Sequence, residues 1–357
     1  MSKRAASIRS GGGAVGEPNR TEQDGAVATR LRRAQAIGAR ARETASQGLI
    51  FGVLLALIAF FSILLPNQFP TAFNVRSMGI SASVIALLAI GQTYVIIGGG
   101  IDLSVGAVLV FSGVVAAKLM AALGADAPLA TLLVAGAGVA MVTGAAWGLV
   151  NGLLVVRTRI PDLIVTLGTM GIALGLAQVL TNGVDVSVPL VLTTVLGNGN
   201  AIGVVPWLVV IALAVAAVMQ VTLSATRFGR HTFAVGSNRE AGRRVGLKVD
   251  AHRIKLYTIS GLLAGLGGFL SLTLYTNTTI AAHSTDNLVS IAAVIIGGTS
   301  LFGGMGSVLR SVAGVLVPVV LQNGFVIMGL RPFWQPVAIG IVLLAAVYID
   351  VRRRAAG

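Results

Sequence analysis

The stretch PLATLLVAGAGVAMVTGAAWGLVNGLLVV, residues 128–156, decides the fold class, because it contains no charged side chain and no alternation of polar and apolar residues. A helix rises about 1.5 Å per residue and the hydrocarbon core of a bilayer is about 30 Å thick, so a run of this length can cross a membrane. Only helices and closed barrels satisfy their backbone hydrogen bonds there, and a continuous apolar run favours a helix. The stretch therefore predicts a membrane-spanning helix.

Apolar segments of this kind recur along the whole chain. They cover residues 49–65, 79–98, 103–123, 128–156, 163–181, 203–223, 256–275, 288–303, 308–329 and 333–350. The chain is 55% hydrophobic and only 11% charged, whereas a soluble domain has about 25% charged residues. We therefore predict an all-α, polytopic transmembrane bundle of about ten spans, occupying residues 49–351.

The positive charges predict how this bundle lies in the membrane. Of the 26 Lys and Arg residues, nine lie in residues 1–48 and eight in the segment 224–255. Cytoplasmic segments are enriched in these residues, so both termini are predicted to be cytoplasmic. Residues 1–48 and 352–357 are predicted to be basic tails, the first of them disordered, and 224–255 a long cytoplasmic loop. Anionic lipids explain this charge more simply than nucleic acid does.

Two glycine-rich stretches interrupt the apolar pattern. Residues 95–106 read VIIGGGIDLSVG and residues 294–306 read VIIGGTSLFGGMG, which makes the segments 79–98 and 288–303 candidates for interrupted helices. Glycine breaks at matching places in two halves of a chain are typical of transport sites. We interpret the pair as an internal repeat; the alternative is a chance match in a chain rich in valine and glycine. The glycines of the breaks are Gly98, Gly99, Gly100, Gly297, Gly298, Gly303 and Gly304.

Other glycines recur four residues apart within the apolar segments. They are Gly144, Gly148 and Gly152, then Gly171 and Gly175, then Gly261 and Gly265. Small residues at this spacing let helix backbones approach closely in lipid. The spacing therefore predicts close helix packing.

The sequence offers no catalytic residues, metal site or cofactor site. It has no G-x-x-x-x-G-K-[ST] phosphate loop, no H-E-x-x-H zinc motif, no G-x-S-x-G nucleophile motif and no cysteine. Asp102 is an acid at or near membrane depth, which is a functional candidate; alternatively, it caps a helix that begins near Leu103. Proton-coupled carriers usually use a relay of acids, so this single acid indicates that the energy for transport comes from elsewhere.

The loop 224–255 contains a short predicted helix. Ser237 and Glu240 have the spacing of a capping box, residues 238–245 can form two helical turns, and Gly246 is suited to end them. From the residues alone, this helix is either a docking element for a partner or a solvated loop helix that touches lipid.

Seven stretches of the chain together are characteristic of one family. They are IGQTYVIIGGGIDLSVG (90–106), GLVNG (148–152), IPDLIVTLGTM (160–170), TNG (181–183), GRHTFAVGSNREA (229–241), SGLLAG (260–265) and IGGTSLFGG (296–304). In this order and at these spacings, they resemble the permease subunits of bacterial ATP-binding-cassette (ABC) importers for monosaccharides of the ribose, xylose, arabinose and galactoside type.

The resemblance implies a dimeric permease in the inner membrane. It implies a separate ATPase, commonly with two fused nucleotide-binding halves, and a periplasmic or lipid-anchored protein that delivers the sugar. It also identifies the short helix as the ATPase-coupling helix, with Ser237, Glu240, Ala241, Gly242 and Gly246 as its key residues.

Two positions depart from the pattern of this family. Gly242 stands where an alanine is usual, which costs about 1 kcal/mol of helix propensity and predicts a looser coupling helix or a different partner. Residues 286–289 read DNLV, with Asn287 and Val289 where the family commonly has two acids. This second departure puts the usual sugar assignment in doubt.

The predicted function is import of a monosaccharide by alternating access, driven by the separate ATPase. Hydroxyl and amide groups along the path would bind the sugar, although each could instead bond to its own helix. The candidates are Thr93, Asp102, Ser104, Thr166, Thr169, Asn182, Thr299 and Ser300. The alternatives are an ABC permease for a nucleoside, branched-chain amino acid, polyol or autoinducer-like sugar, and an ATP-independent secondary carrier.

Overall fold

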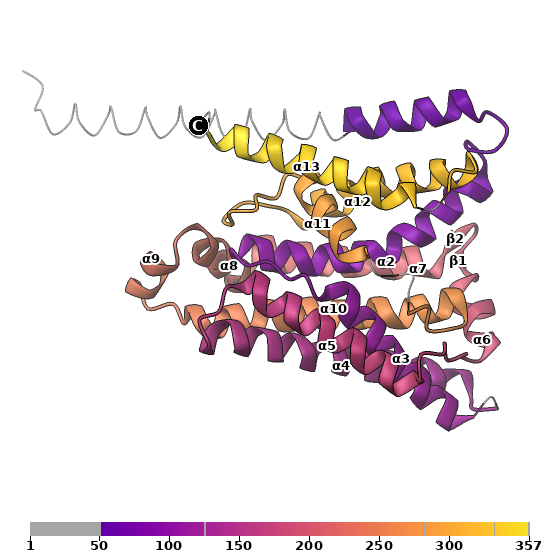
Figure 1. Ribbon diagram of the computed structural model, residues 1–357, viewed down its shortest axis with the longest axis horizontal. Coiled ribbons are helices and arrows are strands. Elements are labelled where there is room, and N and C mark those ends of the chain that lie inside the picture. The colour runs from indigo at the N-terminus through magenta and orange to yellow at the C-terminus, as the bar shows by residue number, and fades with distance from the viewer. Residues whose placement is uncertain (1–50, 125, 281–282, 284, 332, 356–357) are drawn as a thin grey trace, which may run out of the picture. The chain divides into compact units, whose positions relative to one another are not determined.

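The structure is a computed structural model that describes residues 51–124, 126–280, 283, 285–331 and 333–355 (Figure 1). The predicted basic tail 1–48 lies outside these residues. Of the predicted tail 352–357, residues 352–355 continue the last helix.

Each of the predicted apolar segments contains a helix in the described part of the chain. The helices are Phe51–Leu64, α2 (Ala72–Ile97), α3 (Val105–Leu123), α4 (Leu129–Arg157), α5 (Asp162–Thr181), α7 (Trp207–Ala225), α10 (Val249–Tyr275), α11 (Asp286–Ile296), α12 (Val308–Ile327) and α13 (Trp334–Ala355). Among the described residues, 8 helices are long and apolar enough to cross a membrane, whereas Phe51–Leu64 and α11 are shorter. The predicted all-α polytopic bundle is confirmed.

The two segments next to the glycine breaks both end where their break begins, but they differ in length. Helix α2 runs for 26 residues and ends at Ile97, immediately before the first break. It begins earlier than predicted because the Thr71 hydroxyl caps it, accepting the N–H of Asn74 at 3.2 Å. Helix α11 has 11 residues and ends at the second break, as an interrupted helix would.

Helices α2 and α10 form the centre of the bundle. The most apolar stretch of α2 is 89% buried and that of α10 is 78% buried, compared with 22% for α4 and for α7. Helix α10 packs against α2, α3 and α4, and Figure 1 shows α4 and α5 on one side of the central helices and α11 to α13 on the other. The exposed apolar faces of α4, α5 and α7 are therefore available to lipid or to another subunit.

The glycines of α4 bring it against α10 backbone to backbone. A Cβ added at Gly152 would lie 2.8 Å from the Cα of Ile254, and one at Gly144 would collide with a carbonyl oxygen of α10. This confirms the close packing predicted from their spacing. Gly171 and Gly175 of α5 have no atom within 4 Å of an added Cβ, so the same prediction was wrong for that pair within this chain.

The connecting segments lie at opposite ends of the bundle (Figure 1). At one end, the loop 224–255 folds into α8 (Arg227–Ser237) and α9 (Arg239–Arg244). At the other end, α6 (Leu190–Leu192) and the π-helix η1 (Thr193–Gly197) precede a two-stranded antiparallel sheet of β1 (Asn200–Ile202) and β2 (Val205–Pro206), in which Ile202 pairs with Val205.

Candidate functional site

The first glycine break closes the end of α2. The N–H groups of residues 98–100 bond to the carbonyl oxygens of residues 94–96, at 2.9–3.0 Å. Gly99 has a φ of +75°, a left-handed conformation that glycine adopts without steric cost. A left-handed residue at this place satisfies carbonyl groups that the end of a helix leaves free.

The second break repeats this geometry at the end of α11. The N–H groups of residues 297–299 bond to the carbonyl oxygens of residues 293–295, at 2.8–3.1 Å and in the same order. Gly298, the counterpart of Gly99, has a φ of +81°. The shared hydrogen-bond pattern supports the interpretation of the two breaks as an internal repeat.

The two breaks contact each other directly. The N–H of Gly304 donates to the carbonyl oxygen of Ile97 at 2.8 Å. Gly303 has a φ of +83°, and a Cβ added there would lie 3.0 Å from the Cα of Gly99. The backbones are therefore packed so closely that a side chain would separate them.

Helices α8 and α9 join this contact from the loop. A Cβ added at Gly236 of α8 would collide with the carbonyl oxygen of Ile97 and lie 2.7 Å from the nitrogen of Gly304. The guanidinium of Arg239, the first residue of α9, donates to the carbonyl oxygen of Gly99. We call this three-way contact the glycine junction. It comprises residues 97–100, 236–239 and 303–304.

Asn238, and not Ser237, caps α9. The Asn238 side-chain oxygen accepts the N–H of Ala241 at 2.9 Å, while the Ser237 hydroxyl donates to the carbonyl oxygen of Phe233 in α8 at 2.8 Å. The predicted capping box of Ser237 and Glu240 was therefore wrong, because Ser237 still belongs to the preceding helix and the cap lies one residue later. Gly246, with a φ of +83°, follows the end of α9 as predicted.

The exposed face of α9 carries charged side chains, whereas its buried face carries only a glycine. The side chains of Glu240 and Arg244 are 81% and 82% exposed, and 3.8 Å separates their charged atoms. Ala241 is also exposed, whereas Gly242 is buried. A Cβ added at Gly242 would lie 3.5 Å from Val249, so alanine would fit there.

Asp102 is buried in the middle of a hydrogen-bond network. One of its oxygens accepts the N–H and the hydroxyl of Ser104, at 2.9 and 2.6 Å, and the other accepts the hydroxyl of Ser260 in α10 at 3.2 Å. Helix α3 begins only at Val105, so Asp102 holds the turn that leads into the helix and does not cap the helix itself.

Three amide side chains from different helices bond to residues 102–104. Gln92 of α2 donates to the carbonyl oxygen of Asp102, Asn151 of α4 to the Ser104 hydroxyl at 2.7 Å, and Asn287 of α11 to the carbonyl oxygen of Leu103 at 3.2 Å. The oxygen of each amide is buried and has no hydrogen-bond partner among the described residues. We call this set the polar cluster. It comprises Gln92, Asp102, Ser104, Asn151, Ser260 and Asn287.

The polar cluster can bind a neutral solute that carries hydroxyl groups. Unpaired buried acceptors are costly, and a solute that donates to them removes that cost. Sequence reasoning found Asp102 and Ser104 but not the roles of Gln92, Asn151 and Ser260. The available signal was that each is a polar residue within an apolar segment.

The predicted path threonines of α2 and α5 bond to their own helices. Thr93, Thr166 and Thr169 are buried, and their hydroxyls donate to carbonyl oxygens three or four residues earlier, at 2.7–3.2 Å. Asn182 is exposed and, with a φ of +53°, ends α5. Among the described residues, the hydroxyls of these threonines make no hydrogen bond to the polar cluster.

Thr299 and Ser300 lie in the second break. The Thr299 hydroxyl lies 3.3 Å from that of Ser311 in α12, and the Ser300 hydroxyl accepts the N–H of Phe302 at 3.4 Å. Both side chains are buried. Their bonds hold the shape of the break.

Sequence reasoning also missed a buried ion pair beside the first break. Arg253 of α10 donates to both oxygens of Asp162 at 2.8 Å, and the side chains are only 10% and 18% exposed. The Tyr257 hydroxyl donates to Asp162 at 2.8 Å and lies 3.3 Å from the carbonyl oxygen of Ile101. This set links α5 and α10 to the break.

The chain was compared with known proteins. A family model described as the permease component of branched-chain amino acid transport systems matches residues 75–347. The ribose import permease protein of Escherichia coli strain K12 is 36% identical over 307 residues, which cover 84% of this chain and 92% of that protein. The fructose import permease protein of Rhizobium meliloti is 34% identical over 305 residues, covering 84% and 83% of the two chains.

A third relative, the L-arabinose transport system permease protein of Escherichia coli strain K12, is 32% identical over 303 residues, covering 84% of this chain and 88% of that protein. No solved structure matches this chain significantly. The helices that can cross a membrane agree with these matches. The chain therefore belongs to this family of transport-system permease components and is a multi-pass protein of the cell membrane.

Proposed function

We propose that this chain is the transmembrane subunit of an ABC importer that moves a monosaccharide into the cell. The relatives named above are permeases for ribose, fructose and L-arabinose, which supports a sugar as the solute. The observation that carries the proposal is the glycine junction, because it connects an exposed loop helix to the ends of two helices in the bundle.

In this proposal, α9 is the docking helix for a separate ATPase. Glu240 and Arg244 form its exposed surface, and Arg239 at its beginning bonds to the first break. When the ATPase halves close, they displace α9 and α8. Gly236 passes that displacement to residues 97 and 304 because their backbones touch. The result is a change in the relative position of α2 and α11.

The polar cluster is the proposed place where the sugar passes the middle of the bundle. It lies between helices α2, α4, α10 and α11. Helices α2, α4 and α11 each contribute an amide side chain with an unpaired oxygen. The hydroxyl groups of a sugar can donate to these oxygens as the helices move apart. Asn287 stands where the sugar permeases that this chain resembles commonly have an acid, so the cluster carries one negative charge fewer.

The proposed partners are the ATPase, an extracytoplasmic sugar-binding protein and a second copy of the chain. The exposed apolar faces of α5 and α7 give a second copy a surface to pack against. In particular, Gly171 and Gly175 leave open space on α5, where another helix could approach closely.

The test is co-purification of the ATPase from native membranes in mild detergent. Glu240→Arg reverses a charge on the exposed face of α9, and we expect it to abolish recovery of the ATPase. Asp126→Arg is the matched control, because Asp126 is an exposed acid in the loop between α3 and α4, at the other end of the bundle. If the wild type recovers no ATPase, or if both variants recover it as the wild type does, the proposed docking role of α9 is wrong.

A further inference from the structure

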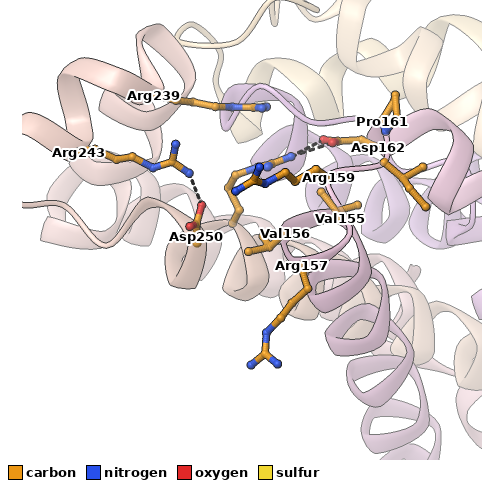
Figure 2. Close-up of a pocket in the computed structure, with 11 residues that line it drawn as sticks. Val155, Val156, Arg157, Arg159, Pro161, Asp162, Arg239, Arg243 and Asp250 are labelled. Atoms are coloured by element: carbon orange, nitrogen blue, oxygen red, sulfur yellow. Dashed lines mark hydrogen bonds and ion pairs between the residues drawn. The ribbon is translucent and has the colours of Figure 1, made fainter.

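A pocket opens beside the glycine junction, where the α4–α5 loop, α9 and α10 meet (Figure 2). Its volume is about 630 Å³, which is within the range of roughly 300–1,000 Å³ that is usual for small-molecule sites. Five arginines and two aspartates line it, together with four apolar residues. The charged residues are Arg157, Arg159, Asp162, Arg239, Arg243, Asp250 and Arg253.

The two aspartates neutralise only two of the arginines. Arg243 pairs with Asp250 at 2.6 Å, and Arg253 pairs with Asp162 at 2.8 Å. The remaining guanidinium groups form no ion pair with a carboxylate among the described residues. Those of Arg157 and Arg159 have no hydrogen bond or ion pair there, and that of Arg239 bonds only to a backbone carbonyl. The pocket therefore has a surplus of positive charge.

Arg159 is held in an unusual backbone conformation that directs it into the pocket. Its φ is +61°, which is rare and costly for a residue with a Cβ. Figure 2 shows Arg159 of the α4–α5 loop and Arg239 and Arg243 of α9 extending toward the same space, whereas Arg157 points away from it. Arg157, the last residue of α4, and Arg159 thus differ in orientation although only one residue separates them.

Arg239 is partly buried among like charges. Burial lowers the pKa of its guanidinium below the ordinary value, and the positive charge of Arg253 lowers this pKa further, while Asp162 opposes the shift. A negative ligand in the pocket would relieve this repulsion. Because Arg239 also bonds to Gly99, it connects the pocket to the glycine junction.

We propose that this pocket binds the phosphate group of a small phosphomonoester from the cytoplasm. A phosphomonoester carries about −1.5 to −2 charges at pH 7, which matches several guanidinium groups better than a single carboxylate does. Planar guanidinium groups also bind phosphate oxygens in pairs. The volume leaves room for a sugar-sized or nucleoside-sized remainder. The same chemistry could be supplied by a phospholipid headgroup, and the experiment separates these two sources.

The experiment is calorimetric titration of the full chain in nanodiscs of phosphatidylcholine. The probes are a pentose 5-phosphate, the same pentose without phosphate, and inorganic phosphate, all at one ionic strength. We expect saturable binding of the phosphorylated pentose and none of the free sugar at this site. Arg159→Gln should weaken binding about tenfold or more, as loss of a charge-assisted hydrogen bond does. Arg230→Gln is the matched control, because Arg230 is an exposed arginine of α8 that does not line the pocket, and it should change binding less than about twofold.

Two further arms identify the source of the phosphate and test the assembled transporter. In the first arm, the nanodiscs contain phosphatidylglycerol. If this lipid weakens binding of the pentose 5-phosphate, and if Arg159→Gln abolishes that weakening, the lipid headgroup is the ligand of the pocket. Equal weakening by the Arg159 and Arg230 variants would overturn the proposal, because it would indicate only general attraction to a basic surface. Absence of binding when the ATPase is attached would also overturn it, since a partner would then cover the pocket.

Discussion

Gly236 and Gly242 make a matched pair for testing the glycine junction, because both lie in the loop 224–255 and both can be replaced by alanine. Gly236 lies in α8 against the backbones of residues 97 and 304. Gly242 lies in α9, where an added Cβ would meet its neighbours only at ordinary van der Waals distances. The same methyl group should therefore have opposite effects at the two positions.

The magnitudes follow from what each added Cβ would meet. At Gly236 it would lie 2.7 Å from the nitrogen of Gly304 and 2.8 Å from the carbonyl carbon of Ile97, and neither backbone atom can move alone. Overpacking costs about 1–3 kcal/mol, and loss of the hydrogen bond from the half-buried Gly304 N–H costs about 1 kcal/mol more. At Gly242 the nearest atoms lie at 3.5 and 3.6 Å, so alanine should instead gain about 1 kcal/mol of helix propensity.

Hydrogen exchange of single amides measures both effects without knowledge of the solute. The Gly304 N–H bonds to Ile97 at 2.8 Å, and a loss of about 2 kcal/mol should speed its exchange about 30-fold in Gly236→Ala. The N–H of Leu247 bonds to the carbonyl oxygen of Gly242 at 3.0 Å, and its exchange should slow about fivefold in Gly242→Ala.

Uptake in cells supplies the functional half of this prediction. Gly236→Ala should reduce ATP-driven uptake at least about tenfold while the protein still inserts into the membrane, and Gly242→Ala should retain it. Wild-type exchange at Gly304 together with full uptake in Gly236→Ala would refute the reasoning, because the junction would then tolerate the separation of its backbones.

Three further predictions concern the bundle. Gly148→Ala puts a Cβ against a carbonyl oxygen of α10 and should lower the melting temperature in detergent, whereas Gly175→Ala, with no atom within 4 Å, should not. Asp162→Asn leaves Arg253 largely buried without its carboxylate and should cost about 3–5 kcal/mol of unfolding free energy. The double variant Asp162→Asn/Arg253→Gln should recover most of this cost, and a double-mutant cycle measures the difference. Asp102→Asn retains the hydrogen-bonding shape and should retain ATP-driven uptake at pH 6 to 8; loss of uptake would show that the charge itself is needed.

The helices could be predicted from the sequence because their cause is local. Each apolar run must be a helix in lipid. The starts of α2 and α10 nevertheless lie seven residues before the predicted ones; the Thr71 hydroxyl caps α2, whereas α10 begins without a side-chain cap. The close packing at Gly144 and Gly148 was predictable because glycines four residues apart are typical of closely packed helices in lipid. The opposite result for Gly171 and Gly175 was not, because spacing alone does not show whether another helix lies opposite.

The site was only partly predictable because it is assembled from distant segments. Asp102 was recognisable as an acid in an apolar context. Its partners were not, because Ser260 of α10 is 158 residues from Asp102, and Asn151 of α4 is 47 residues from Ser104, to which it bonds. Threonines in helices were poor candidates for the opposite reason, since their hydroxyls find a carbonyl of the same helix. The convergence of Arg159 and Arg239 on one pocket likewise depends on a turn with positive φ that the sequence does not signal.

The coupling between α9 and the bundle follows from how α2 ends. A helix leaves its last carbonyl groups without partners, and within a membrane protein these must be paired from elsewhere. The carbonyl of Ile97 is paired by the N–H of Gly304, and that of Gly99 by Arg239. A shift of α9 that left the bundle unmoved would break the bond between Arg239 and Gly99 and leave the half-buried Gly99 carbonyl without its partner, at about 1–3 kcal/mol. The lower-energy response is that the end of α2 and the second break move with α9, and glycine is required there because only bare backbones approach closely enough to make these bonds.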